Sequence, residues 1–238
     1  MSEELRTMVE IGFNVLYLAV VWGMVILMTR RLAGVDKNHR RLANLFRWAF
    51  VLLAVGDTGH VGFRVLAYWM GGLEQNSLLV GLGALATAVT VTFFYVIMLY
   101  VWRERNQAEF GWFEYLLLGS VPIRLLVMAF PQNEWGSPVP PEFWGPFRNA
   151  FLIFLGLGVL FLFLRDAIKS SDRLFRWIAY CIFFSYLFYT PVIFFAREYP
   201  LLGMLMIPKT VMYVAIAGLA YYGLWLKPAR RKHKPQRA

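Results

Sequence analysis

Three ionisable residues, Asp57, His60 and Arg64, stand close together in an otherwise apolar stretch, residues 54–69. At about 100° per residue in an α-helix, these side chains and Tyr68 fall within an arc of roughly 80°. A carboxylate, an imidazole and a guanidinium on one helix face offer two kinds of chemistry. They can transfer protons as acid and base, or they can bind an anion.

Two further cations, Arg124 and Lys209, occur inside apolar segments. The helical rise per residue gives the depth of each residue in the bilayer, and Asp57 lies near the midplane. Arg64 lies roughly 9 Å from the midplane, and Arg124 and Lys209 lie about 5 to 8 Å from it on the same side. Because an ionisable residue at this depth costs roughly 2.5 to 3.5 kcal/mol, three cations against one acid favour an anionic ligand. The alternatives are that the cations extend to the membrane surface, that Asp57 pairs with His60 or Arg64, or that a neighbouring acid such as Glu10 or Glu198 supplies the counter-charge.

Hydroxyl groups in neighbouring segments can complete such a site. Thr87 and Thr90 share a helix face at a spacing of three residues, and Lys209 and Tyr213 share one at a spacing of four. Helix packing is the alternative role for the threonines. The expected ligand-binding residues are Asp57, His60, Arg64, Thr87, Thr90, Arg124, Tyr189, Lys209 and Tyr213.

Three prolines lie beside these positions, Pro122, Pro191 and Pro208. A proline inside a helix removes a hydrogen bond and kinks the axis, which opens a vestibule or simply adjusts the packing. The connection 130–147 is rich in proline and aromatic residues. We expect it to form a stiff lid or to pack inertly on the bundle.

Composition indicates the elements that must position these residues. Of 238 residues, 59% are hydrophobic and 16% charged, as in membrane proteins with several spans. Because about 20 helical residues cross the hydrocarbon core, the chain predicts an all-α bundle of seven transmembrane helices in a single domain, residues 1–226, followed by a basic tail, 227–238. The spans are expected near 11–29, 46–70, 78–102, 112–130, 147–164, 175–196 and 202–226.

The net charge of +10 is concentrated in alternate connections and in the tail. By the positive-inside rule, the N-terminus is outside and the C-terminus cytoplasmic. Because the basic residues lie in alternate connections, membrane orientation explains the positive charge. We therefore expect the lipid bilayer as a partner and no nucleic acid. The expected location is the plasma membrane of a bacterium.

Several kinds of catalytic site are disfavoured. The single cysteine, Cys181, and three histidines are too few for a cysteine cluster or a histidine-rich zinc site, so no metal is expected. No phosphate-binding glycine loop or GxSxG motif is present. Asp57 and His60 can serve as acid and base, but the sequence identifies no nucleophile and therefore no catalytic residue.

Seven spans, an external N-terminus and a lysine in the last span resemble the topology of opsins and other heptahelical receptors. The resemblance implies retinal bound to Lys209 as a Schiff base. The third span, however, carries no carboxylate as counter-ion, and no acidic residue lies one turn before Lys209. We therefore expect no cofactor, with retinal as the alternative.

The segment GDTGHVGFR, residues 56–64, also resembles a GDxxHxxxR segment in the second helix of uncharacterised bacterial seven-helix membrane proteins. The threonine- and tyrosine-bearing third span and the pair Pro208 and Lys209 extend this resemblance. It implies that the three segments form one site, without implying an activity.

The expected function is binding of an anionic small molecule or lipid headgroup in an outward-facing cavity, by a transporter or receptor. Since histidine titrates near neutral pH, His60 makes proton coupling available. The alternative from another class is an intramembrane enzyme that acts on lipid through Asp57 and His60. The oligomeric state is left open.

Overall fold

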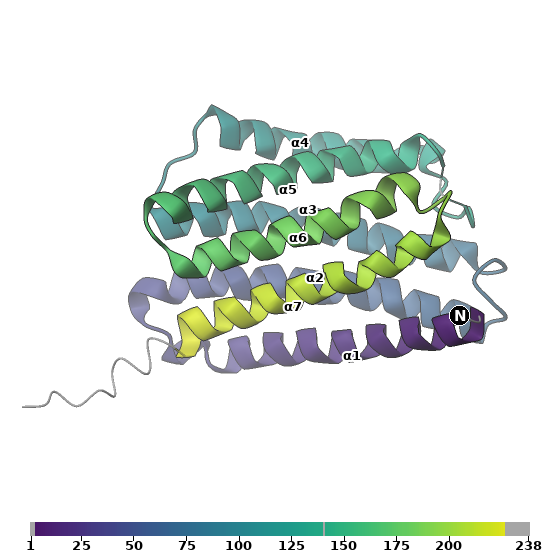
Figure 1. The fold of residues 1–238 in the computed structure, drawn as a ribbon, viewed down its shortest axis with the longest axis horizontal. Coiled ribbons are helices and arrows are strands. Elements are labelled where there is room, and N and C mark those ends of the chain that lie inside the picture. Colours follow the sequence, from purple (N-terminus) through teal and green to yellow (C-terminus); the bar gives the residue numbers. More distant parts are fainter. Residues whose placement is uncertain (1–2, 140, 227–238) are drawn as a thin grey trace, which may run out of the picture.

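Each predicted span forms a helix in the computed structural model, which describes residues 3–139 and 141–226, with side chains from residue 11 onward (Figure 1). Seven of its helices are long and apolar enough to cross a membrane, and the described residues contain no strand, which confirms the all-α class. The predicted tail, 227–238, lies outside the described residues. The long helices are α1 (Glu3–Arg30), α2 (Lys37–Trp69), α3 (Ser77–Asn106), α4 (Trp112–Ala129), α5 (Trp144–Lys169), α6 (Arg173–Phe195) and α7 (Met206–Tyr221).

Four short helical segments complete the described chain. They are the 3₁₀ turns η1 (Leu32–Gly34), η2 (Pro131–Asn133) and η3 (Pro200–Leu205), and a π-helical turn η4 (Tyr222–Leu226). Several helices extend beyond the expected spans. α2 begins at Lys37 rather than near residue 46, because the Asp36 side chain caps it by accepting a hydrogen bond from the Asn38 amide at 3.1 Å.

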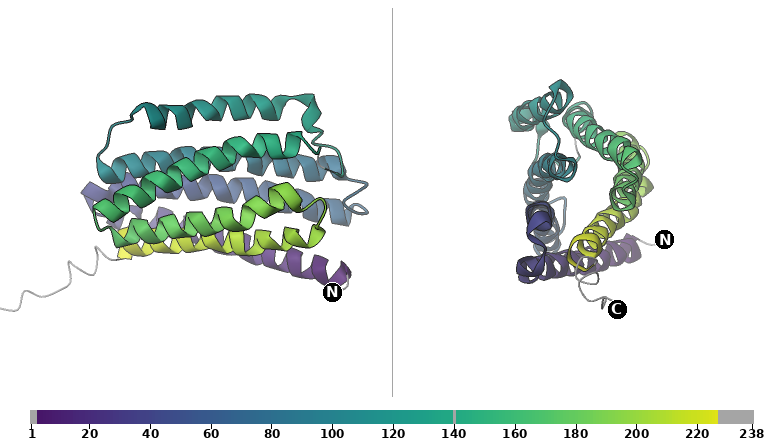
Figure 2. Two further views of the ribbon diagram at one scale, coloured as in Figure 1. Left: turned by 45° about the horizontal axis from the view of Figure 1, so that its top comes forward. Right: turned by 90° about the vertical axis from the view of Figure 1, so that its left-hand side faces the viewer.

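The helices form a closed ring with one helix outside it. α1 contacts α2 and α7, and contacts between α2 and α3, α3 and α5, α5 and α6, and α6 and α7 complete the ring. α4 packs against α5 and α3, as the end-on view in Figure 2 shows. Consecutive helices run in opposite directions, so the connections gather at two ends. We call them the loop-rich end (70–76, 130–143 and 196–205) and the basic end (31–36, 107–111 and 170–172).

The packed core occupies the middle of the bundle and the half toward the basic end. Phe50 meets Phe94 edge to face with ring centroids 5.8 Å apart, and Phe163 stacks on Phe175 at 5.3 Å. All four rings are buried. This packing leaves the half toward the loop-rich end as the place for polar residues.

Glycine permits the close approach of α2 and α3. A Cβ at Gly56 would collide with the Thr90 hydroxyl, and one at Gly59 would lie 3.2 Å from the Cβ of Ala86. Small residues at these positions let the two backbones approach, which fixes the rotation of α2 about its axis. Gly62 differs, since no described atom lies within 4 Å of a Cβ built there.

The three prolines do not all occupy equivalent positions. Pro122 and Pro191 lie inside α4 and α6, as expected. Pro208 instead lies in the first turn of α7, directly after the 3₁₀ segment η3. The expected kink at Pro208 is therefore wrong: a proline in the first turn removes no hydrogen bond from the helix, because the amide there has no acceptor within the helix.

Candidate functional site

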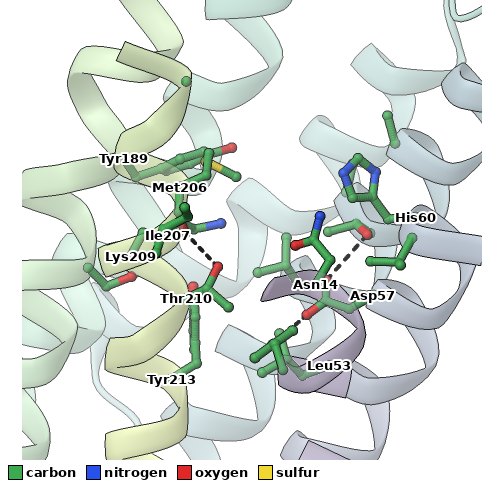
Figure 3. Close-up of a pocket in the computed structure, with 18 of the residues that line it drawn as sticks. Asn14, Leu53, Asp57, His60, Tyr189, Met206, Ile207, Lys209, Thr210 and Tyr213 are labelled. Carbon is green, nitrogen blue, oxygen red and sulfur yellow. Dashed lines mark hydrogen bonds between the residues drawn. The ribbon is translucent and has the colours of Figure 1, made fainter. Parts of the chain in front are cut away.

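A cavity of about 410 Å³ lies inside the ring, in the half toward the loop-rich end. All seven helices contribute to its wall, together with Trp135 of the 130–143 connection and η3. Figure 3 shows Lys209, Tyr189 and Tyr213 on one side and Asp57 and His60 on the opposite side. The charged and imidazole side chains of the wall are Asp57, His60, Arg64, Arg124, Arg148 and Lys209.

Arg124 is almost completely enclosed. It enters the cavity wall from α4, its side chain is 1% exposed, and its Nη1 donates a hydrogen bond of 2.8 Å to the Thr92 hydroxyl of α3. The Arg124 Nε is buried and has no hydrogen-bond partner among the described residues. An arginine presents five donor hydrogens in a fixed plane, so this side chain keeps donor capacity for another acceptor.

Lys209 lies between two tyrosine rings. Its Nζ is 4.4 Å from the centroid of Tyr189 on α6 and 5.6 Å from that of Tyr213, one turn further along α7. The expected shared face of Lys209 and Tyr213 is therefore observed. The π faces stabilise the ammonium without neutralising its charge. None of the ion pairs within 4.0 Å among the described residues includes Lys209, Arg124 or Arg148.

Asp57 is the one carboxylate in the described cavity wall, and two hydroxyls hold it. The Tyr17 hydroxyl of α1 donates to its Oδ2 at 2.6 Å, and the Thr87 hydroxyl approaches its Oδ1 at 3.5 Å. Thr87 also donates to the Gly56 carbonyl at 3.0 Å. No hydrogen bond among the described residues joins Asp57 to His60. The acid is thus fixed by α1 and α3 rather than by its neighbours on α2.

His60 and Arg64 continue the polar stripe of α2 along the cavity. The Nδ1 of His60 is buried without a hydrogen-bond partner among the described residues. On the other side of α2, the His60 backbone lies against Gly83 of α3, where a Cβ would come within 3.0 Å of the His60 Cα. The stripe therefore faces the bundle interior, as its charge requires.

Eight of the nine expected residues line this cavity. The exception is Thr90, whose hydroxyl donates to the Ala86 and Thr87 carbonyls of its own helix at 3.0 and 3.3 Å and lies against Gly56. Its position is that of a packing residue, the alternative that the sequence left open.

The sequence did not single out Arg148, Tyr17 or Asn14, which also line the cavity. Arg148 comes from the first turns of α5, donates to the Asn133 amide oxygen at 3.0 Å and lies 4.0 Å from the ring centroid of Trp135. The available signal was its position one residue inside the span expected from residue 147. A charge at a span boundary is ordinarily solvated, so that signal is weak.

A cluster of tyrosines forms the floor below Lys209. The hydroxyls of Tyr95 and Tyr213 are 3.1 Å apart, and Tyr186 donates to the Leu152 carbonyl at 3.0 Å. Tyr189 donates to the Asn149 amide oxygen at 3.3 Å. These bonds tie α3, α5, α6 and α7 together beneath the cations, so the binding wall is held on rigid helices.

Within the described part of the chain, no three His, Cys, Asp or Glu side chains are grouped so that they could hold a metal ion. Comparisons of the sequence with protein-family models and curated proteins, and of the structure with solved structures, found no match. The geometry of the cavity is therefore the basis for assigning a function.

Proposed function

We propose that this protein binds an anionic small molecule or lipid headgroup in the cavity, as a transporter or receptor of the bacterial plasma membrane. In this proposal the N-terminus and the loop-rich end face outward and the C-terminus is cytoplasmic. The asymmetry of basic connections supports that orientation, because lysine and arginine are enriched on the cytoplasmic side.

One observation carries the proposal: four cationic side chains and a single carboxylate share one enclosed wall. They are Arg64, Arg124, Arg148, Lys209 and Asp57. Charges removed from water without a counter-ion are costly. The buried Arg124 and the half-buried Arg148 and Lys209 lack a carboxylate partner within 4.0 Å among the described residues. A bound anion would supply the missing charge.

The size and donor groups of the cavity support a small ligand group. A volume of about 410 Å³ falls in the range of about 300 to 1,000 Å³ that is usual for small-molecule sites. Guanidinium groups bind carboxylate and phosphate oxygens with paired, charge-assisted hydrogen bonds. The ligand chemistry is therefore a carboxylate or a phosphate ester.

Equilibrium binding tests the proposal directly. The purified protein in nanodiscs is titrated with glycerol phosphate and with succinate, one phosphate and one carboxylate probe. We expect at least one to bind, and Lys209→Met to weaken that binding by about tenfold or more through the loss of a charge-assisted bond. The control is Arg197→Met, which removes an exposed cation outside the cavity wall, where Arg197 pairs with Glu142 at 3.4 Å. Absence of binding for both probes, or equal effects of both substitutions, would contradict the proposal.

Uptake into proteoliposomes separates a transporter from a receptor. A transporter accumulates the bound probe, whereas a receptor binds it without uptake. If transport is coupled to protons through His60 and Asp57, we expect an imposed proton gradient to drive uptake by the wild type. The same gradient should have no effect on uptake by the His60→Gln variant.

Two alternatives remain predictions with their own measurements. An intramembrane lipid-acting enzyme requires turnover that depends on His60, although no hydrogen bond among the described residues links His60 to Asp57. Retinal on Lys209 requires a visible absorption band that is absent in Lys209→Ala.

A further inference from the structure

The roof of the cavity at the loop-rich end is firmly anchored. Trp135 lines the cavity there, its indole donates to the Met128 carbonyl at 3.0 Å, and the Arg148 guanidinium covers its ring. Its own carbonyl packs so closely on Gly81 that a Cβ at Gly81 would collide with it. Access through this part of the roof requires several contacts to break.

The wall between α1 and α7 is formed by the two spans that are least buried. Only 22% of the residues in the most apolar stretch of α1, and 17% in that of Pro200–Leu226, are buried, the two lowest shares among the seven spans. The two helices diverge toward the loop-rich end in both side views (Figures 1 and 2). Near the basic end they are joined, since the Trp225 indole donates to the Met28 carbonyl at 3.1 Å.

Among the described side chains, which begin at residue 11 of α1, no hydrogen bond joins the two helices toward the loop-rich end. Asn14 of α1 and Thr210 of α7 both line the cavity and project from its two sides in Figure 3. The Thr210 hydroxyl donates to the Met206 carbonyl of its own helix, and no hydrogen bond within the described residues involves the Asn14 side chain. His60 and Arg124 line the same cavity, and the buried Nδ1 of His60 and Nε of Arg124 have no hydrogen-bond partner among the described residues.

The cavity wall also combines two chemistries. Phe13, Met206 and Ile207 supply apolar surface from α1 and α7, whereas Arg124 and Arg148 come from α4 and α5 on the far side of the ring. Lys209 also comes from α7, so a ligand that spans the cavity from the α1–α7 wall inward meets apolar side chains and one cation first, and the two arginines last. An amphiphile with a charged head has the matching order of groups.

We infer that the ligand is the phosphate headgroup of a membrane amphiphile, which reaches the cations sideways between α1 and α7 while its chain stays in the bilayer. This inference rests on the proposed anion binding and adds the source of the anion and its route. Asn14 and Thr210 border that route, and the phosphate oxygens accept hydrogen bonds from Arg124 and Lys209.

The experiment compares a phosphate that has an acyl chain with one that has none. Native mass spectrometry of the detergent-solubilised protein is run with dioleoyl phosphatidic acid, and equilibrium binding is measured with glycerol phosphate. We expect phosphatidic acid to bind the wild type at least about tenfold more tightly, which corresponds to about 1.4 kcal/mol from apolar contacts of the chain. Equal affinity, or preference for glycerol phosphate, would show that the anion comes from water.

Substitution at the α1–α7 wall tests the route. Asn14→Trp obstructs it, whereas Leu16→Trp places the same ring on the 65%-exposed side of α1. We expect Asn14→Trp to weaken phosphatidic acid binding by about tenfold, with glycerol phosphate binding retained and with neither changed in Leu16→Trp. Thr210→Trp, with the neighbouring exposed Val211→Trp as control, repeats the test from α7 should Asn14→Trp fail to fold.

The outcomes separate the two proposals. Loss of both ligands in Asn14→Trp and Thr210→Trp, or loss of neither, overturns the sideways route while anion binding stands. If the wild type binds neither phosphatidic acid nor glycerol phosphate, the inference is overturned. If it also fails to bind succinate, the proposed anion binding is overturned.

Discussion

Two arginines near the basic end and the cations of the cavity wall have different kinds of neighbours. Toward the basic end, each of two arginines has a carboxylate partner: Arg105 pairs with Asp172 at 2.6 Å and Arg165 with Asp166 at 2.8 Å. The Trp102 indole donates to the same Asp166 carboxylate at 2.8 Å. The Arg105–Asp172 pair joins α3 to the start of α6, and Asp166, paired with its neighbour Arg165 within α5, joins α5 to α3 through Trp102.

In the cavity wall, three cations have π faces, hydroxyls and amides as neighbours instead. Arg124 donates to Thr92, Arg148 to Asn133, and Lys209 lies over Tyr189. Such partners orient a cation but carry no negative charge themselves. The comparison shows that arginines paired with carboxylates stabilise the fold near the basic end, whereas the cations of the cavity wall can still bind the negative charge of a ligand.

The largest expected effect comes from removing one arginine from each half. Arg124→Met should weaken glycerol phosphate binding by about 100-fold, equivalent to about 2.7 kcal/mol for a charge-assisted bond. It should also raise Tm, because methionine fills the buried site without a charge to desolvate. Arg105→Met should leave binding unchanged and lower Tm, since it leaves Asp172 without its partner.

Titration of both variants in nanodiscs and thermal unfolding of both in detergent provide the measurements. A lower Tm for Arg124→Met with normal binding would mean that Arg124 is a structural residue like Arg105, and the contrast between the halves would disappear.

The next effect concerns the single acid of the loop-rich half. Asp57→Asn keeps an acceptor for the Tyr17 hydroxyl and removes the negative charge that repels an anion. We expect glycerol phosphate affinity to rise by about tenfold, as for one charge removed at several ångströms in a medium of intermediate polarity. The matched control at the basic end is Asp166→Asn, with no change in affinity. Weaker binding in Asp57→Asn would show that Asp57 contacts the ligand favourably.

The sequence predicted the parts of this contrast that depend on one helix at a time. The period of 3.6 residues placed Asp57, His60 and Arg64 on one face, and the spacing of four residues placed Lys209 beside Tyr213. Hydropathy alone was sufficient to predict seven helices, because a chain segment in lipid must satisfy its backbone hydrogen bonds internally, as a helix does.

What the sequence could not supply is the rotation of one helix against another. Thr87 and Thr90 are three residues apart, yet Thr87 lines the cavity and Thr90 packs against Gly56. Tyr17, a lone tyrosine in an apolar run, gave no sign that it would reach Asp57 across 40 residues of chain. These outcomes depend on packing between helices, which local periodicity does not determine.

A smaller effect compares two equivalent hydrogen bonds to carboxylates. Tyr17→Phe and Trp102→Phe each remove one donor to an aspartate. Tyr17→Phe should lower the free energy of unfolding by about 1.5 to 3 kcal/mol, and Trp102→Phe should lower it further, because it also leaves a cavity at a buried ring. Binding should separate them. Asp57, released from Tyr17, can turn toward Lys209 and compete with the anion, which we expect to reduce affinity by about threefold. Unchanged affinity in Tyr17→Phe would mean that Asp57 is held sufficiently by Thr87.

The smallest expected difference lies within one helix turn of α3. Thr87→Ala removes a hydroxyl that lines the cavity and approaches Asp57 at 3.5 Å, and the loss of one weak bond should change glycerol phosphate affinity by about threefold. Thr90→Ala removes a hydroxyl bonded only to its own helix, so affinity should stay within the error of the titration. Because both substitutions remove the same atoms, their difference isolates the direction in which each side chain points. An effect of Thr90→Ala as large as that of Thr87→Ala would mean that α3 is rotated from the orientation that defines the cavity, and the division between a binding half and a packing half would have to be redrawn.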